Sequence, residues 1–390
     1  MAKDIIKLGD VATYINGYAF KPEDRGEEGL QIIRIQDLTG NSYDLGFYNG
    51  KYPKKIEIND GDVLISWSAS LGVYVWNGGK ALLNQHIFKV KFDKVDIDKS
   101  YFVYAVRYKL NDMGKKTHGA TMKHIVKRDF DATEIPYPPL KKQIEIAINL
   151  DKVLMVIKER KRELKLLDEL IKARFVEMFG DPVANPMHWP VKRLKELAIQ
   201  INSGNTPKGG SENYVEKGIT FFRSQNVWKD RLEMDDIAYI DEKTHESMKR
   251  SSLKHGDILM TKTGRINTEN SSLGRAALYE GEDDMANVNG HVYFIRLKEG
   301  VNNKFVLRVL VSPEYRDLIR SVCVGGIDKR QLNKEHIEEF PIIYPPSEMI
   351  DNYIEFVEQV NKSKFDTMTF APIYAIINLY LHTHFYQGRR

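Results

Sequence analysis

The stretch Ile135-Pro136-Tyr137-Pro138-Pro139 recurs almost unchanged as Ile342-Ile343-Tyr344-Pro345-Pro346. Residues 141–179, which follow the first copy, contain neither proline nor glycine, and Gly180-Asp181-Pro182 comes directly after them. Paired prolines suit the start of a helix, and glycine followed by proline stops one. The stretch therefore predicts the end of a domain and the start of a helix of about 40 residues, which at 1.5 Å per residue is roughly 60 Å long.

Further pairs of short motifs occur in the same order ahead of the two copies of this ending. The pairs are Leu8-Gly9-Asp10-Val11-Ala12 with Leu194-Lys195-Glu196-Leu197-Ala198; Ile15-Asn16-Gly17 with Ile201-Asn202-Ser203-Gly204; Ile33-Arg34-Ile35-Gln36-Asp37 with Phe222-Arg223-Ser224-Gln225-Asn226; Gly61-Asp62-Val63-Leu64 with Gly256-Asp257-Ile258-Leu259; and Asn84-Gln85-His86 with Asn289-Gly290-His291. Each match is weak by itself. Their shared order and shared ending indicate an internal duplication whose surface loops have diverged.

The duplication predicts an α+β fold of two similar mixed domains related by a pseudo-twofold repeat. In each copy a Gly-Asp turn signal precedes a short β-rich run, and a helical stretch precedes the Tyr-Pro-Pro ending. We place the first domain at residues 1–139, the long helix at 140–180, the second domain at 181–346 and the start of a second helix at 347–364.

Apolar residues in the long helix recur every seven positions, with a second row at the half-heptad that Arg160 and Arg174 interrupt. Such a seam needs a partner helix, and the run after the second Tyr-Pro-Pro has suitable spacing. We predict an antiparallel coiled coil; the alternative is a linker helix with solvated charges. The expected packing residues are Leu150, Val153, Ile157, Leu164, Leu167, Ile171, Met178, Ile350, Ile354 and Val357.

The end of the second helix departs from this pattern. Past Lys364 the heptad spacing fails, and residues 365–390 are rich in aromatic side chains and contain Pro372. Two explanations stay open at this point: a change of reading frame near Lys364, or a genuine alternative tail.

Composition limits the class of protein. The chain has 390 residues, 42% of them hydrophobic and 29% charged, with a formal net charge of only +4, so any contact with nucleic acid must come from local patches. The single cysteine, Cys323, excludes a disulfide framework. The first residues lack a signal-peptide core, and the longest apolar stretch, residues 368–381, is too short to cross a membrane. We expect a cytoplasmic protein.

The sequence contains none of the common catalytic and cofactor motifs. No P-loop, dinucleotide-binding loop or zinc-protease helix occurs, and Tyr137-Pro138-Pro139-Leu140 lacks the residues of an amino-methyltransferase signature. The acidic pairs Asp235-Asp236 and Asp283-Asp284 lie in polar loops and suit solvated turns better than a metal site. We therefore expect a binding protein that has no catalysis of its own and binds no metal or cofactor.

Basic loops provide the first signal for nucleic-acid binding. A basic, glycine-containing segment lies near the end of the first domain, and a shorter counterpart lies in the second. Such loops can follow phosphates and offer side chains to base edges, although a solvated surface loop is the plain alternative. The candidate residues are Lys115, Lys116, His118, Thr121 and Lys123 in the first domain, and Lys329, Arg330 and Gln331 in the second.

Arginine and glutamine in the duplicated motifs provide the second signal. Arg suits guanine and Gln suits adenine in the major groove, and residues two apart project to one face of a strand. A structural polar pair is the competing interpretation. The candidates are Arg34, Gln36, Arg223, Gln225 and Asn226, together with Ser66, Trp67, Ser68, Lys262, Thr263 and Arg265, which follow the two Gly-Asp strands. Because these last two loops match in position but not in residues, we expect the halves to read different sequences.

The chain resembles the specificity subunit of Type I restriction–modification enzymes. The resemblance covers residues 1 to about 364 and includes the repeated motifs above and Phe175-Val176-Glu177-Met178-Phe179-Gly180-Asp181-Pro182, which enters the second half. It implies two target recognition domains that each read one half of a split site in double-stranded DNA, with the helices setting the spacing. It also implies two methyltransferase subunits, which use S-adenosylmethionine, and two restriction subunits, which use ATP and Mg²⁺. The second helix is about half the length usual in this family.

The competing function is a non-catalytic interaction scaffold, with two protein-binding domains on a coiled-coil spacer. Such a scaffold would show no salt-dependent affinity for DNA, even beside a methyltransferase subunit.

Overall fold

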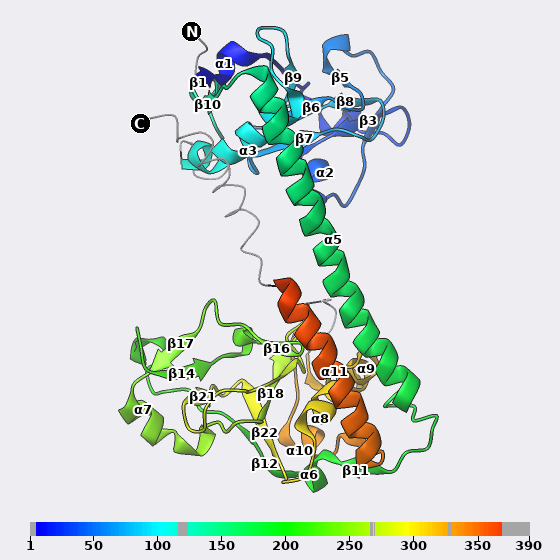
Figure 1. The fold of residues 1–390 in the computed structure, drawn as a ribbon, viewed down its shortest axis with the longest axis vertical. Coiled ribbons are helices and arrows are strands. Elements are labelled where there is room, and N and C mark those ends of the chain that lie inside the picture. The colour runs from blue at the N-terminus through cyan, green and yellow to red at the C-terminus, as the bar shows by residue number, and fades with distance from the viewer. Residues whose placement is uncertain (1–4, 116–123, 266–267, 269, 327–328, 369–390) are drawn as a thin grey trace. The chain divides into compact units, whose positions relative to one another are not determined.

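The chain folds as two units, each built around its own hydrophobic core (Figure 1). The computed structural model describes residues 5–115, 124–265, 268, 270–326 and 329–368, except for the side chains of residue 111 and of residues 365–368. The first unit takes in Met1–Arg162 and the second Glu163–Met368. Most of the atypical tail, residues 369–390, therefore lies outside the described residues.

Two four-stranded sheets form the first unit. The strands of one sheet are, in spatial order, β2 (Thr13–Asn16), β9 (Ile87–Lys91), β6 (Val63–Ser66) and β7 (Gly72–Val75), all antiparallel. The strands of the other are β4 (Phe47–Tyr48), β3 (Leu30–Ile33), β8 (Ala81–Leu83) and β5 (Glu57–Ile58), with β3 and β8 parallel. Helix α3 (Lys99–Lys115) buries Tyr101, Phe102 and Val106 in the core that also holds Val63 and Phe88.

The second unit repeats this arrangement. Its fully antiparallel sheet has the order β12 (Ala198–Ser203), β22 (Val292–Leu297), β18 (Ile258–Thr261) and β20 (Ala276–Leu278). Its other sheet has the order β13 (Tyr214–Val215), β17 (Ala238–Ile240), β14 (Ile219–Phe222) and β21 (Ala286–Val288), with β14 and β21 parallel. The two Gly-Asp strands, β6 and β18, occupy equivalent inner positions. The prediction of a duplicated α+β fold is confirmed.

The strand before each Tyr-Pro-Pro ending pairs with the first strand of its own unit. Strand β1 (Ile5–Lys7) pairs with β10 (Glu134–Pro136), and β11 (Val191–Arg193) pairs with β25 (Pro341–Ile343), both antiparallel. Ile135 and Ile342 are fully buried in these last strands. A tyrosine and two prolines follow each strand, and because proline has no backbone N–H, the pairing ends there, just before the helices that begin at Leu140 and Ser347.

The two Gly-Asp pairs make the same turn. Gly61 and Gly256 have φ of 84° and 87°, in the left-handed region that favours glycine. The Asp62 carboxylate accepts a backbone N–H from Asn59 at 2.8 Å and pairs with Lys89 at 2.8 Å. Asp257 accepts the N–H of Lys254 at 2.8 Å and pairs with Arg296 at 2.7 Å. Each aspartate thus ties the turn before its strand to the neighbouring strand, β9 or β22.

Helix α5 (Leu140–Phe179) contributes to both cores. Its N-terminal part buries Ile146, Ala147 and Leu150 in the first unit. Its C-terminal part packs in the second unit against α11 (Ser347–Met368), as Figure 1 shows. The Tyr353 hydroxyl donates to the Ile171 carbonyl at 3.3 Å, and Lys364 pairs with Asp168 at 2.6 Å. The order of these contacts makes α5 and α11 antiparallel, as predicted.

The expected seam divides along α5. Leu150 is buried in the core of the first unit. Ile171, Ile350 and Val357 are buried in the second core, and Leu167, Met178 and Ile354 pack against it. Val153, Ile157 and Leu164 are half-buried and belong to no core. Within the described residues, no helix is both long enough and apolar enough to cross a membrane.

Candidate nucleic-acid interface

A small three-stranded sheet gathers most of the residues predicted to contact DNA in the second unit. Its strands, in order, are β19 (Thr263–Gly264), β24 (Arg330–Gln331) and β23 (Val324–Gly325). It joins two segments that lie far apart in the sequence. The Lys262 amide donates to the His291 carbonyl at 2.8 Å, and the Lys262 carbonyl accepts from the Leu332 amide at 2.9 Å. Arg265, Lys329 and Gln331 are exposed, whereas Lys262, Thr263 and Arg330 are half-buried.

The first unit has the same backbone arrangement at the equivalent place. The Trp67 amide donates to the His86 carbonyl at 3.1 Å, and the Trp67 carbonyl accepts from the Ile125 amide at 3.0 Å. Ser68 forms a bridge with His124, where Thr263 pairs with Gln331 in the second unit. Two segments predicted separately from the sequence thus lie together in each unit.

Two predicted contact residues of the first unit are buried. Ser66 and Ser68 are each 1% exposed, and the Ser66 hydroxyl donates to the Ser70 carbonyl at 2.5 Å. These side chains cannot reach DNA, because β6 and the bridge after it turn them inward. Trp67 is half-buried against His86, with 4.8 Å between ring centroids, and its indole N–H donates to Asn16 at 3.3 Å.

The basic loop of the first unit is described only at its start. Lys115 is exposed and pairs with Asp112 at 3.8 Å. The other candidates of this loop, Lys116, His118, Thr121 and Lys123, lie outside the described residues.

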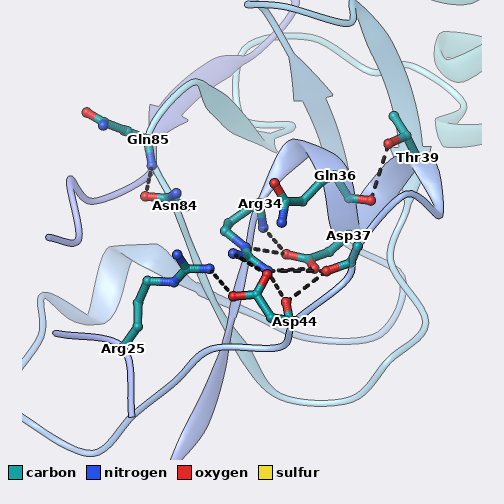
Figure 2. Close-up of polar contacts among 9 residues, drawn as sticks. Arg25, Arg34, Gln36, Asp37, Thr39, Asp44, Asn84 and Gln85 are labelled. Atoms are coloured by element: carbon teal, nitrogen blue, oxygen red, sulfur yellow. Dashed lines mark hydrogen bonds and ion pairs between the residues drawn. The ribbon is translucent and has the colours of Figure 1, made fainter. Parts of the chain in front are cut away.

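Arg34 stands at the N-terminus of a short helix, α2 (Ile35–Thr39), and not on a strand (Figure 2). Its backbone N–H donates to Asp37 at 2.8 Å, and its guanidinium pairs with Asp37 at 3.1 Å and with Asp44 at 3.5 Å. The Arg34 side chain is only 11% exposed. Gln36 lies beside the guanidinium. A base contact by Arg34 would require it to exchange these carboxylates for DNA.

Arg223 repeats this geometry in the second unit. Its backbone N–H donates to Asn226 at 3.0 Å, and its guanidinium pairs with Asp236 at 3.1 Å. The Gln225 amide also donates to Asp236, at 2.7 Å, and this bond and the Arg223 charge hold the pKa of the Asp236 carboxyl below its usual value. Asn226 is 1% exposed and donates to the Glu233 carbonyl, so its prediction as a DNA contact was wrong. Its side-chain amide is hydrogen-bonded within the turn.

Comparison with known proteins identifies the family. The chain matches the family described as "Type I restriction modification DNA specificity domain" twice, over residues 3–166 and 186–369. The chain belongs to this family. Specificity subunits are the non-catalytic part of type I restriction–modification complexes and supply their DNA specificity.

Curated specificity subunits are similar to this chain along much of its length. The EcoBI specificity subunit of Escherichia coli is 25% identical over 293 residues, which cover 67% of this chain and 60% of that protein. The MjaVIII specificity subunit of Methanocaldococcus jannaschii is 23% identical over 391 residues, which cover 93% of this chain and 90% of that protein.

Solved structures show the same fold. The S subunit of a type I system from M. genitalium aligns with a TM-score of 0.51 at 14% identity and covers 97% of this chain and 95% of that one. A chain from a structure on complex assembly and conformational transition of the type I R-M system aligns with a TM-score of 0.58 at 16% identity, with 98% and 97% covered.

Sequence reasoning missed a cationic feature of this specificity subunit. The Arg275 guanidinium lies 3.9 Å from the centre of the Trp228 ring, and Arg275 is only 7% exposed. No motif signals this pair, because Trp228 ends a short strand and Arg275 lies in a loop 47 residues further along the chain. As for metals, the described residues contain no group of His, Cys, Asp and Glu side chains suited to hold an ion.

Proposed function

We propose that this chain reads an asymmetric, split DNA site, with one unit for each half-site. The observation that carries the proposal is a shared backbone frame with unlike side chains. Trp67 of the first unit occupies the place of Lys262 in the second, within the same hydrogen-bond pattern, and both side chains are partly exposed. Since base edges are distinguished by the donors and acceptors offered to them, unlike side chains on one frame would read unlike bases.

The candidate contacts are the residues that the second unit exposes on its small sheet: Arg265, Lys329 and Gln331. Arg34, Arg223 and Gln225 would support the interface by holding loops in place, because carboxylates already occupy their polar groups. Gln36 would support it through the Arg34 guanidinium, which it lies beside. In the first unit, Trp67 and the basic loop that begins at Lys115 remain the candidates.

The proposed partners are two methyltransferase subunits and two restriction subunits. These partners would hold S-adenosylmethionine, ATP and Mg²⁺, and this chain would hold none of them. Because the proposed ligand is cellular DNA, we place the chain with that DNA in the cytoplasm. Family membership favours DNA reading over a protein-binding scaffold, and salt-dependent affinity for DNA separates the two.

Methylation mapping tests this function directly. Genomic DNA from cells that express the chain together with its methyltransferase partner should carry modified bases in a motif split by a spacer. Cells with the methyltransferase alone serve as the control and should lack that motif. An unsplit motif, or a motif with one specified half, would overturn the assignment of one reader to each unit.

A further inference from the structure

A cavity of about 1450 Å³ opens in the second unit. It is lined by the C-terminal part of α5, the hairpin of β15 (Val227–Trp228) and β16 (Arg231–Leu232), the residues before β20, α8 (Asn303–Leu310), α9 (Pro313–Val322) and α11. All of these elements belong to one unit, so the cavity is a feature of its fold.

Five cations line one part of this cavity: Lys172, Lys229, Arg275, Arg316 and Arg320. Burial lowers the pKa of Lys229, and the positive charges of the other four lower it further. Burial and the charge of Arg316 likewise lower the pKa of Arg275. Gathering like charges in this way is unfavourable unless an anion sits among them.

Carboxylates pair with some cations of the cavity, including Arg320 of this group, but not with Lys172, Lys229 or Arg275 among the described residues. Arg308 pairs with Asp230 at 2.6 Å, and Arg320 pairs with Asp317 at 3.1 Å. Within the part of the chain that the structure describes, no carboxylate pairs with Lys172, Lys229 or Arg275. The lysines are therefore available to an incoming anion.

Arg275 is held rigidly in place. Its guanidinium donates to the Ser271 carbonyl at 3.0 Å and to the Asn270 carbonyl, and it stacks on Trp228. A planar cation bonded to neutral carbonyls keeps its full charge, and its low exposure means that water screens this charge weakly.

The cation group adjoins the small sheet. The Ser272 hydroxyl, in the loop that leads to Arg275, donates to the Thr263 carbonyl of β19 at 2.7 Å. Helix α9, which carries Arg316 and Arg320, leads into β23, and Arg330 of β24 donates to the Cys323 carbonyl at 3.2 Å. The candidate base-reading residues and the cations thus share one continuous framework.

We propose that Lys172 and Lys229 bind backbone phosphates of the DNA half-site that the second unit reads, and that the fixed charge of Arg275 beside them favours the bound phosphate. This inference rests on the proposed function. Phosphate contacts fix the register of a protein on the duplex while base contacts specify the sequence, and the cation group lies beside the residues proposed for the latter. Arg275 lies opposite Thr261 in the second unit, and Gly72 lies opposite Ser66 at the equivalent place in the first. Because glycine has no side chain, the first unit lacks a cation at this place, and the proposed phosphate site belongs to the second unit.

The test uses the full chain in complex with its methyltransferase partner. Lys172→Gln and Lys229→Gln are made singly and together, and Lys243→Gln, an exposed lysine of α7 (Glu242–Ser247) outside the cavity lining, is the matched control. Fluorescence anisotropy measures binding to a duplex with the mapped motif and to a scrambled duplex. The KCl concentration is varied between about 50 and 300 mM, because affinity that depends on phosphate contacts falls steeply over this range.

We expect the double variant to bind both duplexes more weakly and to lower the slope of log affinity against log salt by about two. The control should retain the slope of the original chain, and the mapped motif should stay the same in every variant.

Three outcomes would overturn the inference. If the double variant kept the original slope of log affinity against log salt and the preference for the motif, the lysines would not bind phosphates, and the proposed function would be unaffected. Selective loss of preference for the motif would mean that the lysines read bases. Calorimetric binding of inorganic phosphate or ATP that needs Lys229, with an unchanged DNA slope, would identify a free-phosphate site. Absence of any motif preference in the original complex would instead count against the proposed function.

Discussion

At the scale of single residues, the arginines of the duplicated motif act first on their own loops. Arg34 and Arg223 each follow a strand, cap a helical turn and pair with a carboxylate in a later loop, Asp44 or Asp236. Their conserved geometry between the two units indicates a role in holding that loop. A reader of bases would need its donors unoccupied.

Substitution of Arg223 and Asp236 separates these roles. If Arg223 holds the loop, Arg223→Ala and Asp236→Ala should weaken the second half-site alike, and the double variant should be no worse than either single variant. Methylation rates on duplexes with single-base changes measure this. Asp235→Ala, an exposed neighbour, is the control.

A direct base contact gives a different pattern. Arg223→Ala would then lose discrimination at one base, by about 1–3 kcal/mol, while Asp236→Ala would keep it. That result would restore the base-reading role predicted from the sequence.

Two glycines of the repeat allow close approach of two backbone segments. A Cβ at Gly204 would lie 1.9 Å from the Val288 carbonyl oxygen, and a Cβ at Gly17 would lie 2.0 Å from that of Asn84. We expect Gly204→Ala to lower the free energy of unfolding by about 1–3 kcal/mol or more, because backbone must move to make room.

Urea unfolding measures the effect of Gly204→Ala. Gly290→Ala is the control, since a Cβ there meets its nearest neighbour at 3.6 Å and should change stability by less than about 0.5 kcal/mol. Equal effects of the two substitutions would contradict the steric explanation.

At the scale of elements, α5 and α11 are joined in the second unit by a buried aromatic group. Tyr353 of α11 is fully buried, and its ring lies 5.6 Å from that of Phe175 and 5.5 Å from that of Phe179. Burial raises the pKa of Tyr353 to about 12, because the tyrosinate would be poorly solvated there.

This pKa predicts a loss of stability at alkaline pH. The folded state disfavours the ionised phenol, so the contribution of Tyr353 is intact below about pH 10, the pKa of an unfolded tyrosine, and is lost as pH rises toward 12. Tyr353→Phe should cost about 1 kcal/mol at neutral pH, from the lost bond to Ile171, and should decline less steeply above pH 10.

Thermal unfolding from pH 8 to pH 11.5 measures the difference between the two proteins. Other buried tyrosines, such as Tyr101 and Tyr315, are present in both and cancel in the comparison. Parallel declines in melting temperature would show that Tyr353 is not responsible.

At the scale of the whole molecule, one helix serves two cores. Leu150 is 1% exposed in the first core and Phe175 is 3% exposed in the second, although both belong to α5. Duplicated units that each contain their own buried clusters can open separately.

We therefore expect core substitutions in α5 to act on one unit at a time. Leu150→Ala should destabilise the first unit by about 2–5 kcal/mol, and Phe175→Ala the second by about 3–5 kcal/mol. Hydrogen exchange of the β9 amides measures the stability of the first unit, and exchange of the β22 amides measures that of the second. Leu166→Ala, at a residue 52% exposed, should leave both unchanged. Loss of protection in both units after a single substitution would show that they unfold together.

Sequence reasoning was enough to predict the duplication, the Gly-Asp turns, the Tyr-Pro-Pro endings and the long helix. These features depend on local chemistry: a left-handed glycine at Gly61 and Gly256, prolines that end a strand, and uninterrupted helical residues. The packing of Ile171, Ile350 and Val357 followed from helical spacing in the same way.

The complete fold was needed to establish which polar side chains are exposed. Ser66, Ser68 and Asn226 are polar by type but buried by position, and Arg34 and Arg223 are occupied by carboxylates 10 and 13 residues further along the chain. Trp228 of one strand and Arg275, which precedes another, are brought together although no motif marks the pair. Periodicity reports contacts between near neighbours in sequence, whereas charge neutralisation and burial depend on groups brought together by the complete fold.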